Sequence, residues 1–258
     1  MRRFIFSVLV TACCSMGLVS SVHAENFSDD QKKEMETIIH DYLIAHPEVL
    51  RDMAVALDAQ DKQAAKNSQD TALNQSAAEI FHNAADGVVG NPKGDVTIVE
   101  FMDYNCGWCH KSIKEVQALI AEDPNVRIVM KEFPIFGAGS EYAAHAALAS
   151  VRQGKYWAFH QALFSNPGQV TPDVVDKVAK TVGLDVARLK TDMKDPAIDA
   201  ELGKTQDLAS ALQFSGTPGF IVDTTVFPGY ESKEKLLAAV NDVRAQGGCK
   251  LCGNPHTD

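Results

Sequence analysis

The chain has 258 residues, 45% of them hydrophobic, and carries 34 acidic against 24 basic side chains, a formal charge of −10. An acidic surface of this kind favours solubility and argues against nucleic acid or anionic lipid as a partner. The length is sufficient for one large domain, or for one domain with an appended region, around a full hydrophobic core.

The first 24 residues predict a secretory signal peptide. Two arginines precede an uncharged stretch over residues 4–22, and a small-residue site follows at Ala24. We therefore expect an exported, periplasmic protein that is cleaved after Ala24. An uncleaved membrane anchor is one alternative. Lipoprotein processing at Cys13 is another, and it fits less well because the apolar stretch before Cys13 is short.

Residues 25–84 are expected to form a helical region. Residues 28–31 have the form of a capping box at a helix start, and His46-Pro47 marks the end of that helix and the beginning of the next. From Glu48 to about Phe81 large apolar residues are sparse. This second helix is therefore either a solvated spacer or a helix that pairs with copies of itself.

Residues 87–94 read as a linker that leads into an α/β unit. We place this unit, with the linker, at residues 85–247. Val96 to Phe101 predicts a buried strand, and apolar residues at helical spacing predict a helix that starts directly after it. We further expect a strand at 126–130 and a helical insertion over about 137–212. The helices expected within the insertion are at 141–152, 156–164, 172–182, 187–193 and 198–212. A hairpin with strands at 219–223 and 225–227 and a helix at 233–245 should follow.

The string Cys-Gly-Trp-Cys-His occupies residues 106–110 and has two interpretations. It is either a c-type haem attachment site or a redox-active thiol pair followed by a histidine. The preceding buried strand favours the second, because the N-terminus of the following helix stabilises a thiolate at Cys106. Cys106, in an exposed first turn, is then the attacking thiol, and Cys109, on the buried face, resolves the mixed disulfide. A c-type haem electron carrier and a non-enzymatic envelope scaffold stay open as alternatives.

Three neighbours of the cysteines are candidates for tuning their redox potential. Gly107 and Trp108 lie between the cysteines, and we expect Trp108 on the substrate-facing surface. His110 is either an ordinary solvent-facing helix residue, which we favour, or a further positive charge near the thiolate.

Cys249 and Cys252 form a second Cys-x-x-Cys pair, within a tail at residues 248–258. Glycines precede this pair and Asn254-Pro255 follows it, so no helix would acidify Cys249. A local disulfide that closes the tail is the leading interpretation. An auxiliary thiol shuttle and a pair of metal ligands are the alternatives, although the sequence offers no obvious further ligands. We expect no cofactor and no resident metal.

Several of these motifs occur in the order found in a known family. Val99-Glu-Phe101 before the Cys-Gly-Trp-Cys motif, the helical block, and Gly216-Thr-Pro-Gly219 before the hairpin resemble the thioredoxin superfamily, in its DsbA-like branch with a helical insertion. The stretches 131–137 and 142–147, with the helical segment from Phe27, are similar to members that carry an N-terminal oligomerisation region, such as the ScsC type.

The resemblance implies an α/β thioredoxin fold, a homo-oligomer formed through residues 25–84, and disulfide exchange in secreted or envelope proteins. It implies that Pro218 is a cis-proline against the cysteines and that Thr217 presents its backbone to an extended substrate strand. Glu100 is the implied buried acid that exchanges a proton with Cys109. Asp103, nearer in sequence, is expected at the loop surface.

The expected partners are reduced or misoxidised proteins and a membrane thiol redox partner, either DsbD-like or DsbB-like. The direction of exchange stays open between oxidase and isomerase. The Gly-Trp dipeptide with Thr217 before the proline is similar to isomerase-type members, and paired N-terminal helices would place several sites around one substrate. The redox potential depends on how strongly the protein stabilises the thiolate, which the sequence does not give.

Overall fold

The computed structural model describes residues 27–253, in two compact units. Residues 1–59 make up the first unit and residues 60–258 the second. The expected signal peptide and the last residues of the tail lie outside the described residues. Within residues 27–253, no helix combines the length and apolar character that a membrane span requires.

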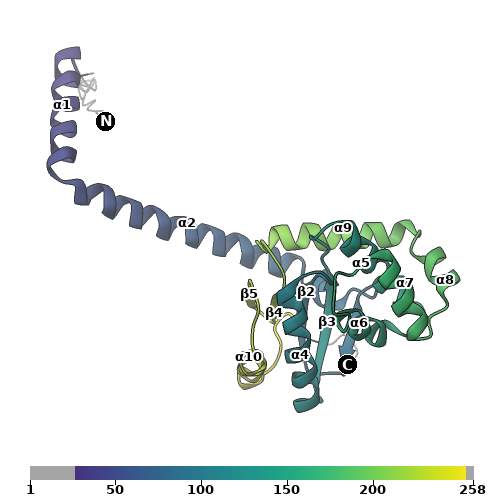
Figure 1. Cartoon of the computed structure of the whole chain (residues 1–258). Helices are drawn as coiled ribbons and strands as arrows, with labels where there is room; N and C mark the ends of the chain where they lie inside the picture. The colour runs from purple at the N-terminus through teal and green to yellow at the C-terminus, as the bar shows by residue number, and fades with distance from the viewer. Residues whose placement is uncertain (1–26, 254–258) are drawn as a thin grey trace, which may run out of the picture. The chain divides into compact units, whose positions relative to one another are not determined.

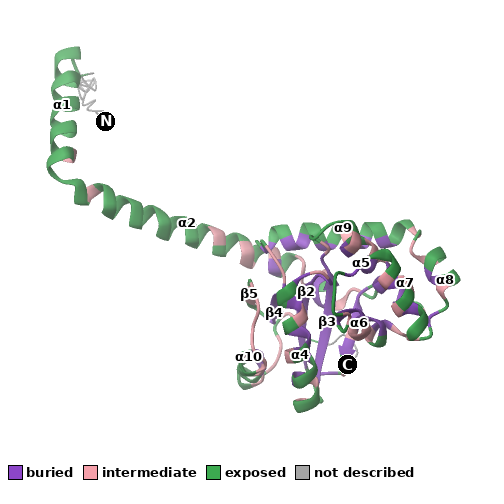
Figure 2. Cartoon of the chain, in the orientation of Figure 1, coloured by how far each residue is buried: buried purple, intermediate pink, exposed green. Residues whose placement is uncertain are grey.

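The first unit contains α1 (Asp29–Ala45) and the beginning of α2 (Pro47–Gln75). The expected capping box is present: the Ser28 hydroxyl accepts from the Gln31 N–H at 3.2 Å, and the Gln31 side chain accepts from the Ser28 N–H at 2.9 Å. Helix α1 buries none of its residues, as Figure 2 shows. The large apolar side chains exposed along this unit are those of Phe27, Met35, Ile38, Ile39, Tyr42, Ile44, Leu50, Met53, Val55 and Leu57.

The second unit is built on a five-stranded sheet in the order β1-β3-β2-β4-β5 (Figure 1). Its strands are β1 (Gly87–Gly90), β2 (Val96–Met102), β3 (Val126–Glu132), β4 (Gly219–Val222) and β5 (Thr225–Phe227). Strands β2 and β3 are parallel and the other pairs are antiparallel. Every residue of β2 and β3 is buried, which explains their rich content of β-branched and apolar residues.

The helices after α2 are α3 (Ala77–His82), α4 (Gly107–Glu122), α5 (Ala138–Val151), α6 (Tyr156–Phe164), α7 (Pro172–Thr181), α8 (Val186–Asp192), α9 (Pro196–Ala211) and α10 (Lys233–Ala245). From α4 onward the helices agree closely with those predicted, whereas the helix expected from Glu48 to about Phe81 is interrupted at Ser76. The α/β thioredoxin fold with its helical insertion is confirmed. Helix α10 contacts α4, β2 and β4, whereas α5 and α6 contact β1.

Two sequence expectations differ from the structure near the start of the second unit. The linker expected at 87–94 contains strand β1, whose Val89 is buried and which pairs with β3. The compact unit also begins upstream of residue 85, because Leu73, Ile80 and Phe81 are buried in its core.

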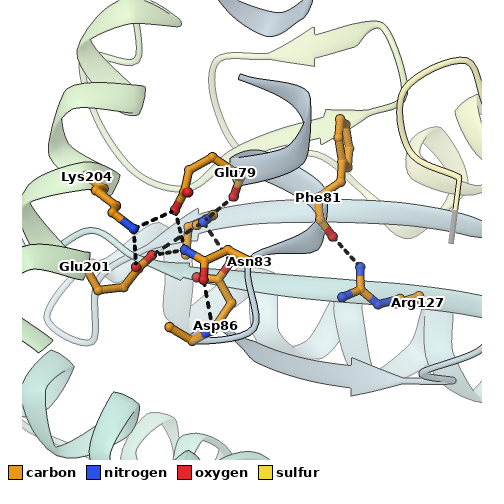
Figure 3. A network of polar contacts seen from close by, with 9 residues as sticks. Glu79, Phe81, Asn83, Asp86, Arg127, Glu201 and Lys204 are labelled. Carbon is orange, nitrogen blue, oxygen red and sulfur yellow. Dashed lines mark hydrogen bonds and ion pairs between the residues drawn. The ribbon is translucent and has the colours of Figure 1, made fainter. Parts of the chain in front are cut away.

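A buried polar network joins α3 to β3 and α9 (Figure 3). The Lys131 ammonium, which is fully buried, contacts Asp86 at 2.7 Å and donates to the Glu79 carbonyl at 2.8 Å. Asn83 donates to both Glu79 and Glu201. These contacts make α3 part of the same folded body as the sheet.

Candidate active site

The sheet register brings two distant segments together at one end of β2. Strand β2 ends at Met102, and the cysteine motif follows at the start of α4. Because β4 runs antiparallel to β2, with Gly219 opposite Phe101, the residues just before β4 arrive beside this motif. The Thr217–Pro218 peptide bond there is cis.

Cys106 is the N-cap residue of α4, and its Sγ atom lies 3.1 Å from the Thr217 carbonyl oxygen. The residue is only 3% exposed, which corrects the expectation of an exposed position. The segment before β4 covers the cysteine, and this cover could not be read from the helix pattern alone.

The surroundings of Cys106 stabilise its thiolate. Its pKa is lowered to about 5, first because the Cys109 thiol donates a hydrogen bond to its sulfur. The Thr217 side chain and the backbone N–H groups of Trp108 and Cys109 act in the same direction, while burial opposes them. The Thr217 hydroxyl is buried and has no hydrogen-bond partner of normal geometry among the described residues, so its proton is available to the nearby sulfur.

Cys109 has the opposite character. Burial, the hydrogen bond to Cys106 and the nearby Glu100 carboxyl all raise its pKa well above the usual range. The residue is 1% exposed. At neutral pH the pair therefore holds one thiolate and one thiol, which is the arrangement needed for attack by Cys106 followed by resolution by Cys109.

Glu100 lies in β2 beneath the pair and is buried. Its Oε1 accepts from the Ser112 hydroxyl at 2.8 Å, and its Oε2 has no hydrogen-bond partner among the described residues. Burial raises its pKa to about 8, against the lowering effect of Ser112. A carboxyl group that titrates near neutrality beside Cys109 is able to take up or release the proton of that thiol.

His110 is held between two backbone carbonyls instead of facing solvent. Its Nε2 lies 2.9 Å from the Tyr104 oxygen and its Nδ1 lies 3.0 Å from the Phe164 oxygen. Carbonyl oxygens only accept, so a protonated ring nitrogen donates to the oxygen that it faces. Because both ring nitrogens lie against carbonyl oxygens, neither is open to bind a haem iron.

Trp108 is the exposed residue of this turn, at 57%. Its ring lies 5.5 Å from that of Tyr230, and the Lys111 ammonium sits over both rings. Gly107 is open to solvent, since an added Cβ would meet no atom within 4 Å. A cleft of about 700 Å³, lined by Gly107, His110, Phe136 and Phe164 among others, adjoins the cysteines.

Asp103 is buried, in contrast to the expected surface position, and it organises the loop. Its Oδ1 accepts from the Asn105 N–H and the Ser140 hydroxyl, each at 2.7 Å. Its Oδ2 accepts from the N–H groups of Ile135 at 2.7 Å and Phe136 at 3.0 Å. Two loops are thereby fixed around Cys106.

A second buried cluster, which sequence reasoning missed, supports the same loop. The hydroxyl groups of Tyr104 and Tyr156 donate to Glu132 Oε1 at 3.0 and 2.8 Å. His160 Nδ1 lies 3.0 Å from the Tyr104 hydroxyl, and burial lowers the pKa of His160 to about 3, so its ring is neutral. No short motif links these residues, which come from the loop after β2, from β3 and from α6.

The structure thus brings Glu100, Cys106, Cys109, Thr217 and Pro218 together with their neighbours Gly107, Trp108 and His110. It does not bring in the second pair. Cys249 and Cys252 are joined by a disulfide, and the Cys249 sulfur lies 3.5 Å from the Asp95 carbonyl oxygen, just before β2 begins. The second pair therefore lies at the opposite end of β2 from Cys106.

Comparison with known families gives two matches in different parts of the chain. The sequence model described as a DSBA-like thioredoxin domain matches residues 97–241. The model described as the copper resistance protein ScsC N-terminal domain matches residues 31–64.

Solved structures give similar results. A thioredoxin-like oxidoreductase from Silicibacter pomeroyi DSS-3 is 45% identical, with a TM-score of 0.64, over 65% of this chain and 97% of that one. The thiol-disulfide exchange protein alpha-DsbA2 from Wolbachia pipientis is 27% identical, with a TM-score of 0.63, over 69% and 97%. A periplasmic thioredoxin-like protein from Salmonella enterica serovar Typhimurium is 25% identical, with a TM-score of 0.60, over 66% and 95%.

The chain also matches one part of curated proteins that are much longer than it is. The Na(+)/H(+) antiporter NhaA 3 of Salinispora tropica is 29% identical over 175 residues, which are 67% of this chain and 27% of the antiporter. The chain therefore spans about a quarter of the length of this relative.

Proposed function

Because the chain belongs to the family of DSBA-like thioredoxin domains, and carries an ScsC-type N-terminal domain, we propose that it is an exported thiol:disulfide oxidoreductase that uses Cys106 and Cys109. One observation carries this proposal. Cys106 caps the N-terminus of α4 with its sulfur 3.1 Å from the Thr217 carbonyl oxygen and with Cys109 in the first turn behind it, and this setting lowers the pKa of Cys106 to about 5.

The proposed reaction is a pair of thiolate–disulfide exchanges. The Cys106 thiolate attacks one sulfur of a substrate disulfide, forms a mixed disulfide and releases the other sulfur as a thiolate. In isomerisation, that thiolate attacks another disulfide of the substrate, and the thiolate released there attacks the substrate sulfur bound to Cys106, which forms a new substrate disulfide and releases the Cys106 thiolate. In reduction, Cys109 attacks the Cys106 sulfur and leaves a reduced substrate and an oxidised enzyme. In the reverse direction the oxidised pair donates its disulfide to a reduced protein.

The two supporting residues act on different steps. The Thr217 carbonyl oxygen lies 3.1 Å from the Cys106 sulfur, so the backbone of an extended substrate that reaches this sulfur would lie beside Thr217. Glu100 receives the proton that Cys109 must lose before it attacks. The low pKa of Cys106 favours the reduced form of the pair and therefore makes the oxidised form a good disulfide donor.

Partners and location belong to the same proposal. The substrates are reduced or misoxidised proteins of the cell envelope, and a membrane thiol protein, DsbD-like or DsbB-like, restores the working redox state. Export rests on the signal-like segment before Ala24 and agrees with the periplasmic thioredoxin-like relative. The apolar residues exposed along α1 and the start of α2 support pairing of this region between copies of the chain.

Two assays test the proposal. The first measures the reactivation of a scrambled-disulfide substrate by the reduced protein, and the second measures the oxidation of a reduced substrate by the oxidised protein. Activity in the first assay identifies an isomerase, and activity in the second alone identifies an oxidase. Cys106→Ala should abolish both, whereas Cys109→Ala should accumulate mixed disulfides on a non-reducing gel. Failure of Cys109→Ala to trap any substrate would contradict the assigned roles.

A further inference from the structure

The second cysteine pair has a carboxylate partner that the sequence did not reveal. Asp223, in the turn between β4 and β5, is buried, and its Oδ1 accepts from three successive backbone N–H groups. The donors are Lys250 at 2.8 Å, Leu251 at 2.7 Å and Cys252 at 3.2 Å. The cysteine loop is therefore held against Asp223 by the backbone as well as by the disulfide.

We propose that Asp223, Cys249 and Cys252 form a zinc site when the disulfide between the two cysteines is reduced. One ligand atom from each residue lies within 4.8 Å of the others. Around tetrahedral zinc, with Zn–S near 2.3 Å and Zn–O near 2.0 to 2.2 Å, neighbouring ligand atoms are separated by roughly 3.5 to 3.8 Å. Opening the disulfide allows the two sulfurs to reach this separation while the bonds to Asp223 keep the loop in place.

The chemistry of the three ligands selects the metal. The Cys-x-x-Cys spacing is typical of zinc sites, and two thiolates with one carboxylate suit a borderline divalent ion better than Cu(I), which prefers sulfur alone. Two free thiolates beside the Asp223 carboxylate would repel one another, and a divalent cation removes that repulsion. Asp223 Oδ1 is already engaged, so Oδ2 is the oxygen left for the metal.

The reaction balances with a protein dithiol as reductant. The dithiol transfers two electrons and two protons to the Cys249–Cys252 disulfide and itself becomes a disulfide. Zinc then displaces the two thiol protons and binds both sulfurs and the carboxylate. The fourth position is left to water, because Cys249 is only half-buried whereas Cys252 is fully buried.

This site is separate from the exchange centre. Cys249 lies near Asp95, before β2, and Cys106 follows the other end of that seven-residue strand. At about 3.3 Å per residue the two centres are roughly 20 Å apart. Zinc at the second pair would leave Cys106 free to react, and direct exchange between the two pairs of one chain is excluded by distance.

The experiment uses residues 25–258, the expected mature protein, with Cys106→Ser and Cys109→Ser. Because Cys13 and Cys14 lie before residue 25, this leaves Cys249 and Cys252 as the one cysteine pair. After phosphine reduction and anaerobic desalting, Zn²⁺ is titrated in competition with a chromogenic chelator. We expect one equivalent of bound Zn²⁺ in the reduced protein and none in the oxidised protein. A further Cys249→Ser/Cys252→Ser change should abolish binding, and Asp223→Asn should weaken it at least tenfold. Asn retains an oxygen for the three N–H groups but loses the second carboxylate oxygen.

The proposal is overturned if the reduced protein binds less than one equivalent, or if Asp223→Asn binds Zn²⁺ as tightly as its parent. Circular dichroism checks that the Asp223→Asn protein is folded. Should it be unfolded, Co²⁺ supplies a readout that needs no substitution at 223. Tetrahedral coordination with thiolate charge-transfer bands supports the site, whereas an octahedral spectrum without such bands refutes it.

Discussion

Cys106 and Cys109 lie one helical turn apart, yet their surroundings separate their acidities widely. The Cys109 thiol, the Thr217 side chain and the N–H groups at the helix N-terminus lower the pKa of Cys106, whereas burial, the contact with Cys106 and the Glu100 carboxyl raise the pKa of Cys109. The division of roles that we propose for the two thiols follows from their neighbours, since the two side chains are chemically identical.

The first prediction concerns pH. In the reduced protein, alkylation of Cys106 by iodoacetamide should rise to half its maximal rate at pH about 5 and be level above neutrality. A thiol in an unfolded chain has a pKa of about 8.5, so the lowered folded value stabilises the reduced protein above that pH. This stabilisation is lost as the pH falls towards 5. Mass spectrometry identifies the alkylated residue, and a midpoint near 8 would show that the thiolate is not stabilised.

The second prediction concerns Glu100. Glu100→Gln should keep the hydrogen bond from Ser112 but remove the proton acceptor, so the attack of Cys109 on a preformed mixed disulfide should slow by about 10²-fold at pH 8. The parent rate should rise with pH towards 8 as Glu100 ionises, and the variant should lose this rise. Quenched-flow kinetics measures both. The alkylation profile of Cys106 serves as the control, and an unchanged pH profile of resolution would exclude Glu100 as the acceptor.

The site residues that lie in short sequence motifs could be predicted from the sequence. The residues that come together only in the folded structure could not. Cys106, Cys109 and Pro218 lie in recognisable strings. Asp103 and Glu132 carry no such mark, because their partners are backbone groups and hydroxyls from distant segments. A lone acid after a strand reads as a surface residue until the loops that bury it are known.

At the scale of elements, the long periodic segments were predictable and a short edge strand was not. Helix α10 was predicted at its observed bounds, since amphipathic spacing over 13 residues is a strong signal. Strand β1 has only four residues, with glycine at both ends, so its composition reads as a turn. It is fixed by pairing with β3, which is a tertiary contact.

The third prediction concerns the network that attaches α3 to β3. Lys131→Met should lower the free energy of unfolding by about 3 to 5 kcal/mol, because it leaves the Asp86 carboxylate buried without its cation. Lys204→Met is the matched control. The Lys204 side chain is 54% exposed beside Glu79 and Glu201, so its loss should change stability by less than about 1 kcal/mol. Urea unfolding compares the two, and equal effects would contradict the buried role.

At the scale of the whole molecule, the first unit shows apolar surface that the second does not. Ten large apolar side chains are exposed in the described part of the first unit. In the described part of the second unit there are three, those of Trp108, Ile135 and Phe136. A helix such as α1 that buries none of its residues depends on another surface for its stability. Pairing between copies would provide it.

The fourth prediction tests that pairing. Ile38→Glu with Tyr42→Glu places charges on the apolar stripe of α1 and retains good helix formers, so the mass measured by light scattering should fall. Glu36→Lys is the control on a polar position and should leave the mass unchanged. Removal of all residues to 84 is unsuitable, because it would delete Leu73 and Phe81 from the core. An unchanged mass for the double variant would refute the pairing.

The position of Trp108 has a practical consequence. The chain has two tryptophans, and Trp108 lies exposed between the reactive sulfurs, whereas Trp157 is partly buried and stacked on His160 at 5.4 Å. Indole emission responds to solvent and to adjacent sulfur. We therefore expect the emission of Trp108 to change on oxidation of the cysteine pair and on contact with a substrate, and the emission of Trp157 to stay nearly constant. The protein thereby contains its own optical reporter, and turnover can be followed in real time without a dye.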